Sequence, residues 1–176
     1  GYVEWITGTT HVESFAFSIA RRDHWDLTDV IAVVSSGHKD VGSREGHTSA
    51  STSEFQHARV LTAESRLHEC RRALLERDFN TFARVVEHDS DMMHAVMMTS
   101  SPPLFYWKPG SLELMERVRT WRREGLPVCY TLDAGPNVHC ICLADAANEI
   151  AARVAQIPGV ESVLSAGVGG GAVVIA

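Results

Sequence analysis

One carboxylate, Asp133, stands where an apolar strand meets a turn in the stretch "YTLDAGPN", residues 130–137. Ala134 and Gly135 leave room beside it, and the pair Gly135-Pro136 enforces a sharp exit from the strand. A carboxylate in such an open position can act as a general base or orient a reacting hydroxyl. Alternatively, the side chain bonds to the backbone of its own turn, which is common before glycine. The local sequence leaves both interpretations open.

A second candidate is "GSREGH", residues 42–47, where a glycine-rich and serine-rich stretch enters a predicted helix at Ser43. Free backbone N–H groups, the helix dipole, the Ser43 hydroxyl and the Arg44 guanidinium would converge there, which favours a phosphate ligand. Lys39 lies just upstream and adds positive charge. The simpler alternative is a serine helix cap beside a solvated arginine.

The remaining chemistry-bearing residues give weaker signals. His94, in "MMHAVMM", lies on a mainly apolar helix and is read as a core residue, and the run 93–98 as core packing rather than a binding patch. The nine histidines show none of the spacings typical of metal sites, so we expect no metal ligand set in this chain. No G-x-S-x-G elbow indicates a serine nucleophile.

Composition sets the class of protein. The 176 residues are 45% hydrophobic and carry a net charge of −6, which predicts one domain, or one and a part, and argues against nucleic acid as the main partner. No apolar run reaches the roughly 18 residues of a membrane span, and the opening "GYVEWITG" does not resemble a signal peptide. Cys140 and Cys142 fall on one face of a predicted strand, as a buried reduced pair. We expect a cytoplasmic protein with no membrane contact.

The elements that must position these residues follow from apolar spacing and from Gly and Pro. The pattern predicts a hairpin over 1–20, a buried strand over 30–34, helices from 43, over 61–78, 79–100, 110–125 and 145–157, two strands within 127–143, and a final pair of strands within 160–176. Ser111 and Asp145 are the expected N-caps of the helices over 110–125 and 145–157. The prolines of "SPP", residues 101–103, should end the helix over 79–100.

This order predicts an α+β fold, an antiparallel sheet with helices packed on one face. The fold would be a ferredoxin-like domain over residues 29–176. The strands within 1–28 would belong to a preceding domain, and their exposed apolar edges make dimerisation or strand addition plausible.

Five stretches taken together resemble one family: "GYVEW", "VVSSGHKDVGSREGH", "TSEFQHAR", "DSDMMHAVMMTSSPPLFYW" and "YTLDAGPN". In this order and spacing they are similar to the C-terminal half of diphosphomevalonate (mevalonate pyrophosphate) decarboxylase and its phosphomevalonate decarboxylase relatives, of the GHMP kinase superfamily. The similarity spans nearly the whole chain.

The resemblance implies an ATP- and Mg²⁺-dependent decarboxylase of isoprenoid biosynthesis. Such enzymes phosphorylate the tertiary 3-hydroxyl of a phosphorylated mevalonate and release phosphate and CO₂. It casts Asp133 as the catalytic carboxylate beside the 3-hydroxyl, and Ser43 and Arg44 as ligands of the substrate's phosphate end. It also implies a homodimer. The family's nucleotide loop belongs to an N-terminal half that this chain does not include, so we expect ATP and Mg²⁺ to be held mainly there and the chain alone to be inactive.

Two departures concern the substrate. Relatives that use a diphosphate commonly read "V-S-S-R-x-G-M", whereas Gly42 replaces a serine here and His47 replaces the methionine. Gly42 removes a hydroxyl donor and His47 brings a potential partner for an anion, which leaves room for a monophosphate substrate. Two other functions remain open: a small-molecule kinase of the same superfamily, which "DAGPN" disfavours, and a non-catalytic binding module. The residues encoded upstream of Gly1 would discriminate between enzyme and module.

Overall fold

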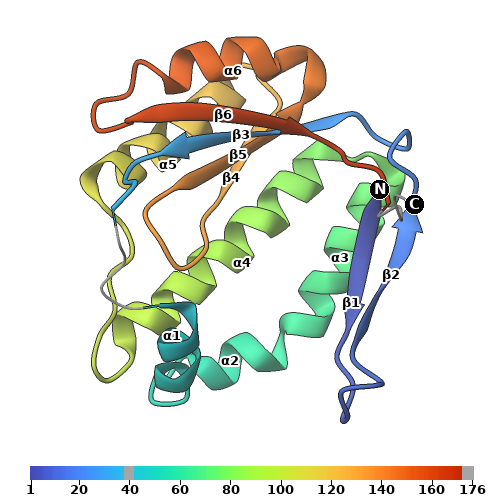
Figure 1. The fold of residues 1–176 in the computed structure, drawn as a ribbon, viewed down its shortest axis with the longest axis vertical. Coiled ribbons are helices and arrows are strands. Elements are labelled where there is room, and N and C mark those ends of the chain that lie inside the picture. Colours follow the sequence, from blue (N-terminus) through green and yellow to red (C-terminus); the bar gives the residue numbers. More distant parts are fainter. Residues whose placement is uncertain (38–41, 172–176) are drawn as a thin grey trace, which may run out of the picture.

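The computed structural model describes residues 1–37 and 42–171, without the side chains of residues 43–45. Two antiparallel sheets and a set of helices make up this part of the chain (Figure 1). The strands are β1 (Tyr2–Ile6), β2 (Phe15–Ala20), β3 (Leu27–Val33), β4 (Val128–Thr131), β5 (Val138–Leu143) and β6 (Ser162–Gly167). The helices are α1 (Ser43–Ala50), α2 (Gln56–Leu61), α3 (Ala63–Glu76), α4 (Phe79–Thr99), α5 (Pro109–Arg123) and α6 (Ala147–Val154), the last preceded by a 3₁₀ turn, η1 (Ala144–Ala146).

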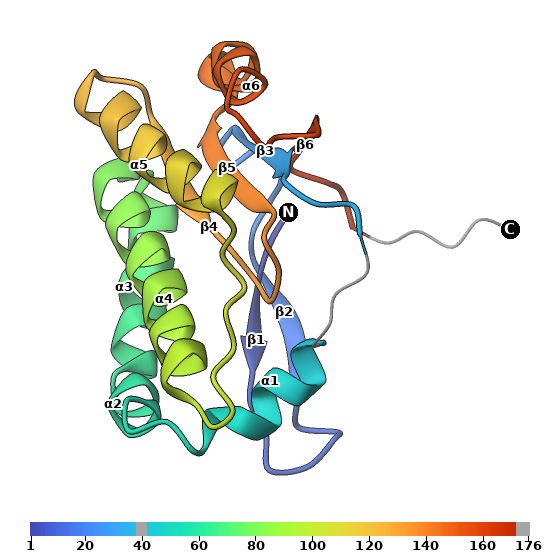
Figure 2. The ribbon, with the colours of Figure 1, turned by 90° about the vertical axis from the view of Figure 1, so that its left-hand side faces the viewer.

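The main sheet has the order β4-β5-β3-β6, and its neighbouring strands all run antiparallel. Alternate residues of its strands point to one face, where they form the main core with α5 and α6. Cys140 and Cys142 lie on this face, fully buried and unbridged, as the strand alternation predicted. This architecture confirms the predicted α+β class (Figure 2).

Helix α4 runs along β4, the edge strand of the sheet, and its polar side chains bond to the free edge. Glu87 Oε1 accepts from the Tyr130 N–H at 3.3 Å, and Ser90 Oγ accepts from the Leu132 N–H at 3.0 Å. Arg122 of α5 donates to the Val128 carbonyl at 2.8 Å. Both of its terminal nitrogens also donate to the Glu87 carboxylate, at 2.6 and 2.7 Å. These bonds satisfy main-chain groups that an edge strand otherwise leaves to water or to another chain.

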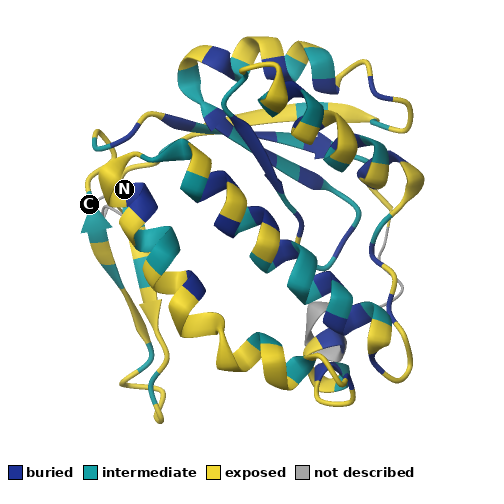
Figure 3. Ribbon diagram, turned by 180° about the vertical axis from the view of Figure 1, so that it is seen from behind, coloured by how far each residue is buried: buried dark blue, intermediate teal, exposed yellow. Residues whose placement is uncertain are grey.

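The opposite face of the sheet packs against α3 and α4 at one end, through a cluster that includes Trp25, Phe82 and Cys129. The β1–β2 hairpin forms its own two-stranded sheet beside α3. It is tied to the cluster by Tyr2, whose hydroxyl donates to the Trp25 carbonyl. Much of the hairpin is exposed (Figure 3), including Trp5 at 63%. Its assignment to a separate domain, residues 1–28, stays a prediction.

Several boundaries differ from expectation. Helix α5 begins at Pro109 rather than at a Ser111 cap, because proline at the first helical position is already set to the helical φ. Ser111 therefore lies in the first turn, where its hydroxyl accepts from the Lys108 N–H. The Asp145 cap was also wrong, since α6 is preceded by η1 and has Ala146 at its N-cap. The second strand of the final predicted pair falls largely on residues 172–176, outside the described part.

No helix of the described residues has the length and apolar character that a membrane crossing requires.

Candidate functional site

Three anchors hold the turn that carries Asp133. The Gly135 N–H donates to the Asp133 carbonyl at 2.8 Å, Ser111 Oγ donates to the Pro136 carbonyl at 2.6 Å, and Asn137 Oδ1 accepts from the Val34 and Ser35 N–H groups at 2.9 and 3.2 Å. The Asn137 bonds tie this turn to the end of β3, from which the chain leads to α1. The motif "DAGPN" thus fixes the path of the backbone on both sides of Asp133.

The Asp133 side chain itself is exposed and, within the described part of the chain, takes part in no hydrogen bond. The turn is closed by main-chain atoms, so the alternative in which the carboxylate caps its own turn is not what the structure shows. An uncommitted carboxylate on an anchored backbone can bind a ligand hydroxyl without first breaking an internal bond.

Ser90 holds the residue that precedes Asp133. Its buried hydroxyl bonds with both the N–H and the carbonyl of Leu132, at 3.0 and 3.3 Å. One turn further along α4, His94 is 1% exposed and lies against the Trp107 ring at 4.9 Å between centroids. Burial lowers the pKa of His94, although the Leu132 backbone and the nearby Asp133 charge act in the opposite direction, and this favours the neutral imidazole.

We expect Ser90→Ala to lower kcat by about tenfold or more with a smaller effect on KM, because Asp133 would lose its fixed position. The buried Leu132 groups would also lose their partner, at a cost of about 1–3 kcal/mol in the free energy of unfolding. Steady-state kinetics and urea unfolding of the complete protein check both effects. Ser100→Ala is the matched control, since Ser100 is equally buried at the end of α4 and bonds with Met97 and Pro102 carbonyls. Equal loss of kcat in both variants would contradict a positioning role for Ser90.

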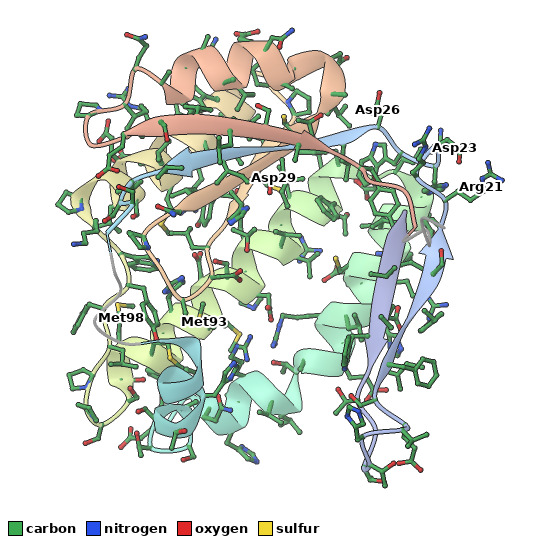
Figure 4. All side chains as sticks on the ribbon, viewed as in Figure 1. Arg21, Asp23, Asp26, Asp29, Met93 and Met98 are labelled. Atoms are coloured by element: carbon green, nitrogen blue, oxygen red, sulfur yellow. The ribbon has the colours of Figure 1, made fainter. Side chains whose placement is uncertain are left out.

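Asp133 opens onto a cavity of about 450 Å³, within the usual size range of small-ligand sites. Its walls come from α1, α2, α4, the segment after α4 and the Asp133 turn, and Figure 1 shows that turn reaching toward α1. The lining residues are Gly46, His47, Ala50, Gln56, Arg59, Met93, Val96, Met97, Tyr106, Asp133 and Ala134. Met93 leaves α4 toward the space beside α1 and α2 (Figure 4), so part of the methionine run that was read as core also lines this cavity.

Helix α1 begins at Ser43 with Gly42 at its N-cap, as the sequence predicted for the helix start. Ser43 is therefore the first helical residue rather than the cap itself. The side chains of Ser43 and Arg44, and the whole of Lys39, lie outside the described residues, so their roles as phosphate ligands stay predictions. His47, one turn along α1, is exposed and shares the cavity with Asp133.

Gly46 explains the glycine of "S-R-E-G". A Cβ at this position would meet the Tyr106 hydroxyl oxygen at 2.7 Å and Met97 Sδ at 3.3 Å. Tyr106 and Met97 are both buried, so neither can move away freely. A Cβ at this position would force α1 or these side chains to shift, so glycine suits the close packing of α1 against the segment after α4.

We expect Gly46→Ala to displace α1 and to cost about 1–3 kcal/mol of stability through overpacking. Because α1 carries Ser43 and Arg44, the predicted phosphate ligands, at its start, the KM for a phosphorylated substrate should rise in parallel. Thermal unfolding and steady-state kinetics measure the two effects. Gly167→Ala on β6 is the control for added bulk, since a Cβ at Gly167 would meet no atom of the described residues within 4 Å. Unchanged stability and KM in Gly46→Ala would contradict the packing role.

A second histidine lies on the sheet face that carries Thr131. His139 of β5 bonds through Nδ1 to Asp29 Oδ2 of β3 at 2.8 Å, and this bond, against the effect of burial, raises the pKa of His139. The Asp133 charge raises it further. Asp29 lies within β3, whereas Arg21, Asp23 and Asp26 lie on the exposed connection between β2 and β3 (Figure 4).

Sequence reasoning missed Ser90, Asn137, Ser111 and Arg59 as parts of this site. Asn137 was visible as a member of the motif, but its partners, 102 and 103 residues away in the chain, were not. Ser90 carries a weak signal, because it is a polar residue on the buried stripe of an amphipathic helix. No group of three or more His, Cys, Asp or Glu residues in the described part is placed to hold a metal ion.

Comparison with known proteins places the fold and the turn in one family. The family model for the mevalonate 5-diphosphate decarboxylase C-terminal domain matches residues 29–168, and the chain belongs to this family. Diphosphomevalonate decarboxylase from Candida albicans is 36% identical over 154 residues, which cover 85% of this chain and 42% of that protein.

Solved structures agree. Mevalonate diphosphate decarboxylase from Staphylococcus aureus superimposes with a TM-score of 0.86 at 26% identity, over 96% of this chain and 51% of that one. A structure described as MDDEF in complex with MVAPP, AMPPCP and magnesium gives a TM-score of 0.84 at 28% identity, over 94% and 51%. The chain thus spans about half or less of the length of these relatives. The relatives are named as decarboxylases, so the comparisons do not favour the alternative of a small-molecule kinase.

Proposed function

We propose that this chain forms the substrate-binding part of an ATP-dependent decarboxylase that converts a phosphorylated mevalonate to an isopentenyl phosphate or diphosphate. The observation that carries the proposal is the uncommitted Asp133 carboxylate, held on an anchored turn at the mouth of a cavity shared with α1. The family membership and the ligands named for the related structure support the substrate class and the use of ATP and magnesium.

In the proposed reaction the substrate's 3-hydroxyl attacks the terminal phosphoryl group of ATP, and ADP leaves. Asp133 orients that hydroxyl and accepts its proton. The C3–O bond then breaks and phosphate departs with the electron pair. The bond between C2 and the carboxylate breaks in turn, CO₂ leaves, and its electrons form the C2–C3 double bond. The Asp133 carboxylate stabilises the positive charge that develops at C3.

The phosphate end of the substrate is proposed to bind at the start of α1. Its free N–H groups and its dipole favour an anion, and Ser43 and Arg44 are proposed to complete this site, with Lys39 and His47 nearby. ATP and Mg²⁺ are proposed to bind mainly through the part of the relatives that this chain does not cover. Magnesium bound to the nucleotide would neutralise phosphate charge. The proposed setting is a cytoplasmic homodimer.

The test is ATP-dependent release of ¹⁴CO₂ from 1-¹⁴C-labelled phosphomevalonate and diphosphomevalonate by the complete protein. We expect release to require ATP and to occur with at least one of the two substrates. Gly42 and His47 stand at positions where relatives that use a diphosphate commonly have Ser and Met, and they lead us to expect substantial turnover of the monophosphate. A strong diphosphate preference would refute the monophosphate expectation alone, whereas no release from either substrate would refute the proposed function.

A further inference from the structure

Arg59 stands at the junction of two hollows. It lines the Asp133 cavity, and it also lines a larger groove of about 870 Å³ bounded by β1, α3 and α4. It is the cationic side chain that α2 presents to the Asp133 cavity. The start of α1 lies on a different element, so Arg59 is separate from the predicted phosphate site there.

Asp89, the acidic partner of Arg59 within the described residues, is shared with a second arginine. Asp89 receives the Nε–H of Arg66 at 2.8 Å on Oδ1, while the Arg59 terminal nitrogen lies 3.4 Å from Oδ2, near the limit of a hydrogen bond. Arg66 is 7% exposed and also donates to the Thr62 hydroxyl and, at 2.9 Å, to the Arg59 carbonyl. Arg66 therefore links α2 and α3 to α4. Its bond to Asp89 is the shorter of the two that this carboxylate accepts from arginine.

Arg59 is left with unused donors and an unbalanced charge. Its Nε is buried and has no hydrogen-bond partner within the described residues. Two guanidinium groups share one carboxylate, so the cluster of Arg59, Arg66 and Asp89 carries one net positive charge. A buried donor without a partner is unfavourable, and a planar guanidinium pairs best with a carboxylate or a phosphate. The arrangement suits an oxyanion that enters the cavity from outside the chain.

We infer that Arg59 binds an anionic group of the substrate, the carboxylate or the phosphate, while Asp133 binds the hydroxyl. This inference rests on the proposed function, because it takes the substrate to be a phosphorylated mevalonate. Asp133 itself is a poor neighbour for an anion. A cation that lines the same cavity lets one ligand place its hydroxyl at Asp133 and its negative group at Arg59.

The experiment measures binding to the complete protein by calorimetry, for wild type, Arg59→Gln and the control Arg84→Gln. Arg84 is an exposed arginine paired with Glu69, and it lines neither hollow. We expect Arg59→Gln to weaken binding of the substrate that the wild type uses by about tenfold to a hundredfold, the usual effect of losing a charged hydrogen-bond partner. Arg84→Gln should bind like the wild type, and the melting curves of both variants should stay close to that of the wild type.

Two fragments identify the group. Mevalonate carries the carboxylate without a phosphate, and isopentenyl phosphate carries a phosphate without the carboxylate. Weaker binding of only one fragment by Arg59→Gln assigns that group to Arg59. If wild type binds the phosphorylated mevalonates and Arg59→Gln binds them equally well, the inference about Arg59 is wrong while the proposed function stands. If wild type binds neither substrate, both fail.

Discussion

The Asp133→Asn variant of the complete protein should lose turnover by roughly 10²–10⁴-fold, the usual range for loss of a general base, with a folded structure like that of the wild type. The carboxylate makes no internal hydrogen bond among the described residues, so its replacement by an amide of the same shape removes no contact on which the turn depends. Substrate binding should be nearly retained, because the phosphate end of the substrate is proposed to bind at the start of α1. The measurement is single-turnover CO₂ release together with the Kd of the substrate.

Asp145→Asn is the control for this variant. Asp145 lies in η1 after β5, and it lines none of the hollows described. Its amide should leave kcat unchanged. Near-normal turnover by Asp133→Asn would contradict a catalytic role for Asp133 and leave it as a residue of the turn. Loss of folding in Asp133→Asn would mean that the carboxylate stabilises the turn after all.

The second large effect concerns stability. Glu87→Ala should lower the free energy of unfolding by about 3–5 kcal/mol, because it leaves a partly buried Arg122 without its counter-charge. It also removes the acceptor of the Tyr130 N–H on the edge strand β4. Both losses weaken the contact between α4 and the strand that leads to Asp133. Urea unfolding of the complete protein, followed by circular dichroism, measures the change.

An exposed pair provides the comparison. Glu113 and Arg117 bond at 2.8 Å on the outer side of α5, with side chains 37% and 55% exposed. Glu113→Ala should cost no more than about 0.5 kcal/mol, as is typical for a surface pair one helical turn apart. Similar losses in Glu87→Ala and Glu113→Ala would contradict the account of α4 as the polar partner of the edge strand.

Strand alternation and helix spacing allowed the sequence to predict the sheet, the main helices and the cysteine pair. These features depend on neighbours within a few residues. The start of α1 was predictable for the same reason, since Gly42 and Ser43 mark a helix start locally. Ser111 shows the limit, because Pro109 two residues earlier already begins the helix.

The contacts that define the candidate site were out of reach because they are tertiary. Ser90 matters only because α4 runs beside β4 in one register, and that register brings its hydroxyl to Leu132, 42 residues away. Arg59 and Arg66 look alike in the sequence, seven residues apart on helices. Only the structure shows that Asp89 bonds more closely to Arg66 than to Arg59, and that Arg59 lines the cavity. The role of Asp133 was suggested by the family resemblance, whereas its freedom from internal bonds is a structural finding.

The central claim is that a phosphorylated mevalonate binds with its 3-hydroxyl at Asp133. The most direct measurement is a crystal structure of the complete protein with the substrate and a non-hydrolysable ATP analogue. The account predicts the Asp133 carboxylate within hydrogen-bond distance of the 3-hydroxyl, about 2.6–3.2 Å, and the phosphate end at the start of α1. A substrate bound with its 3-hydroxyl away from Asp133, in contact with another acid or base, would contradict it.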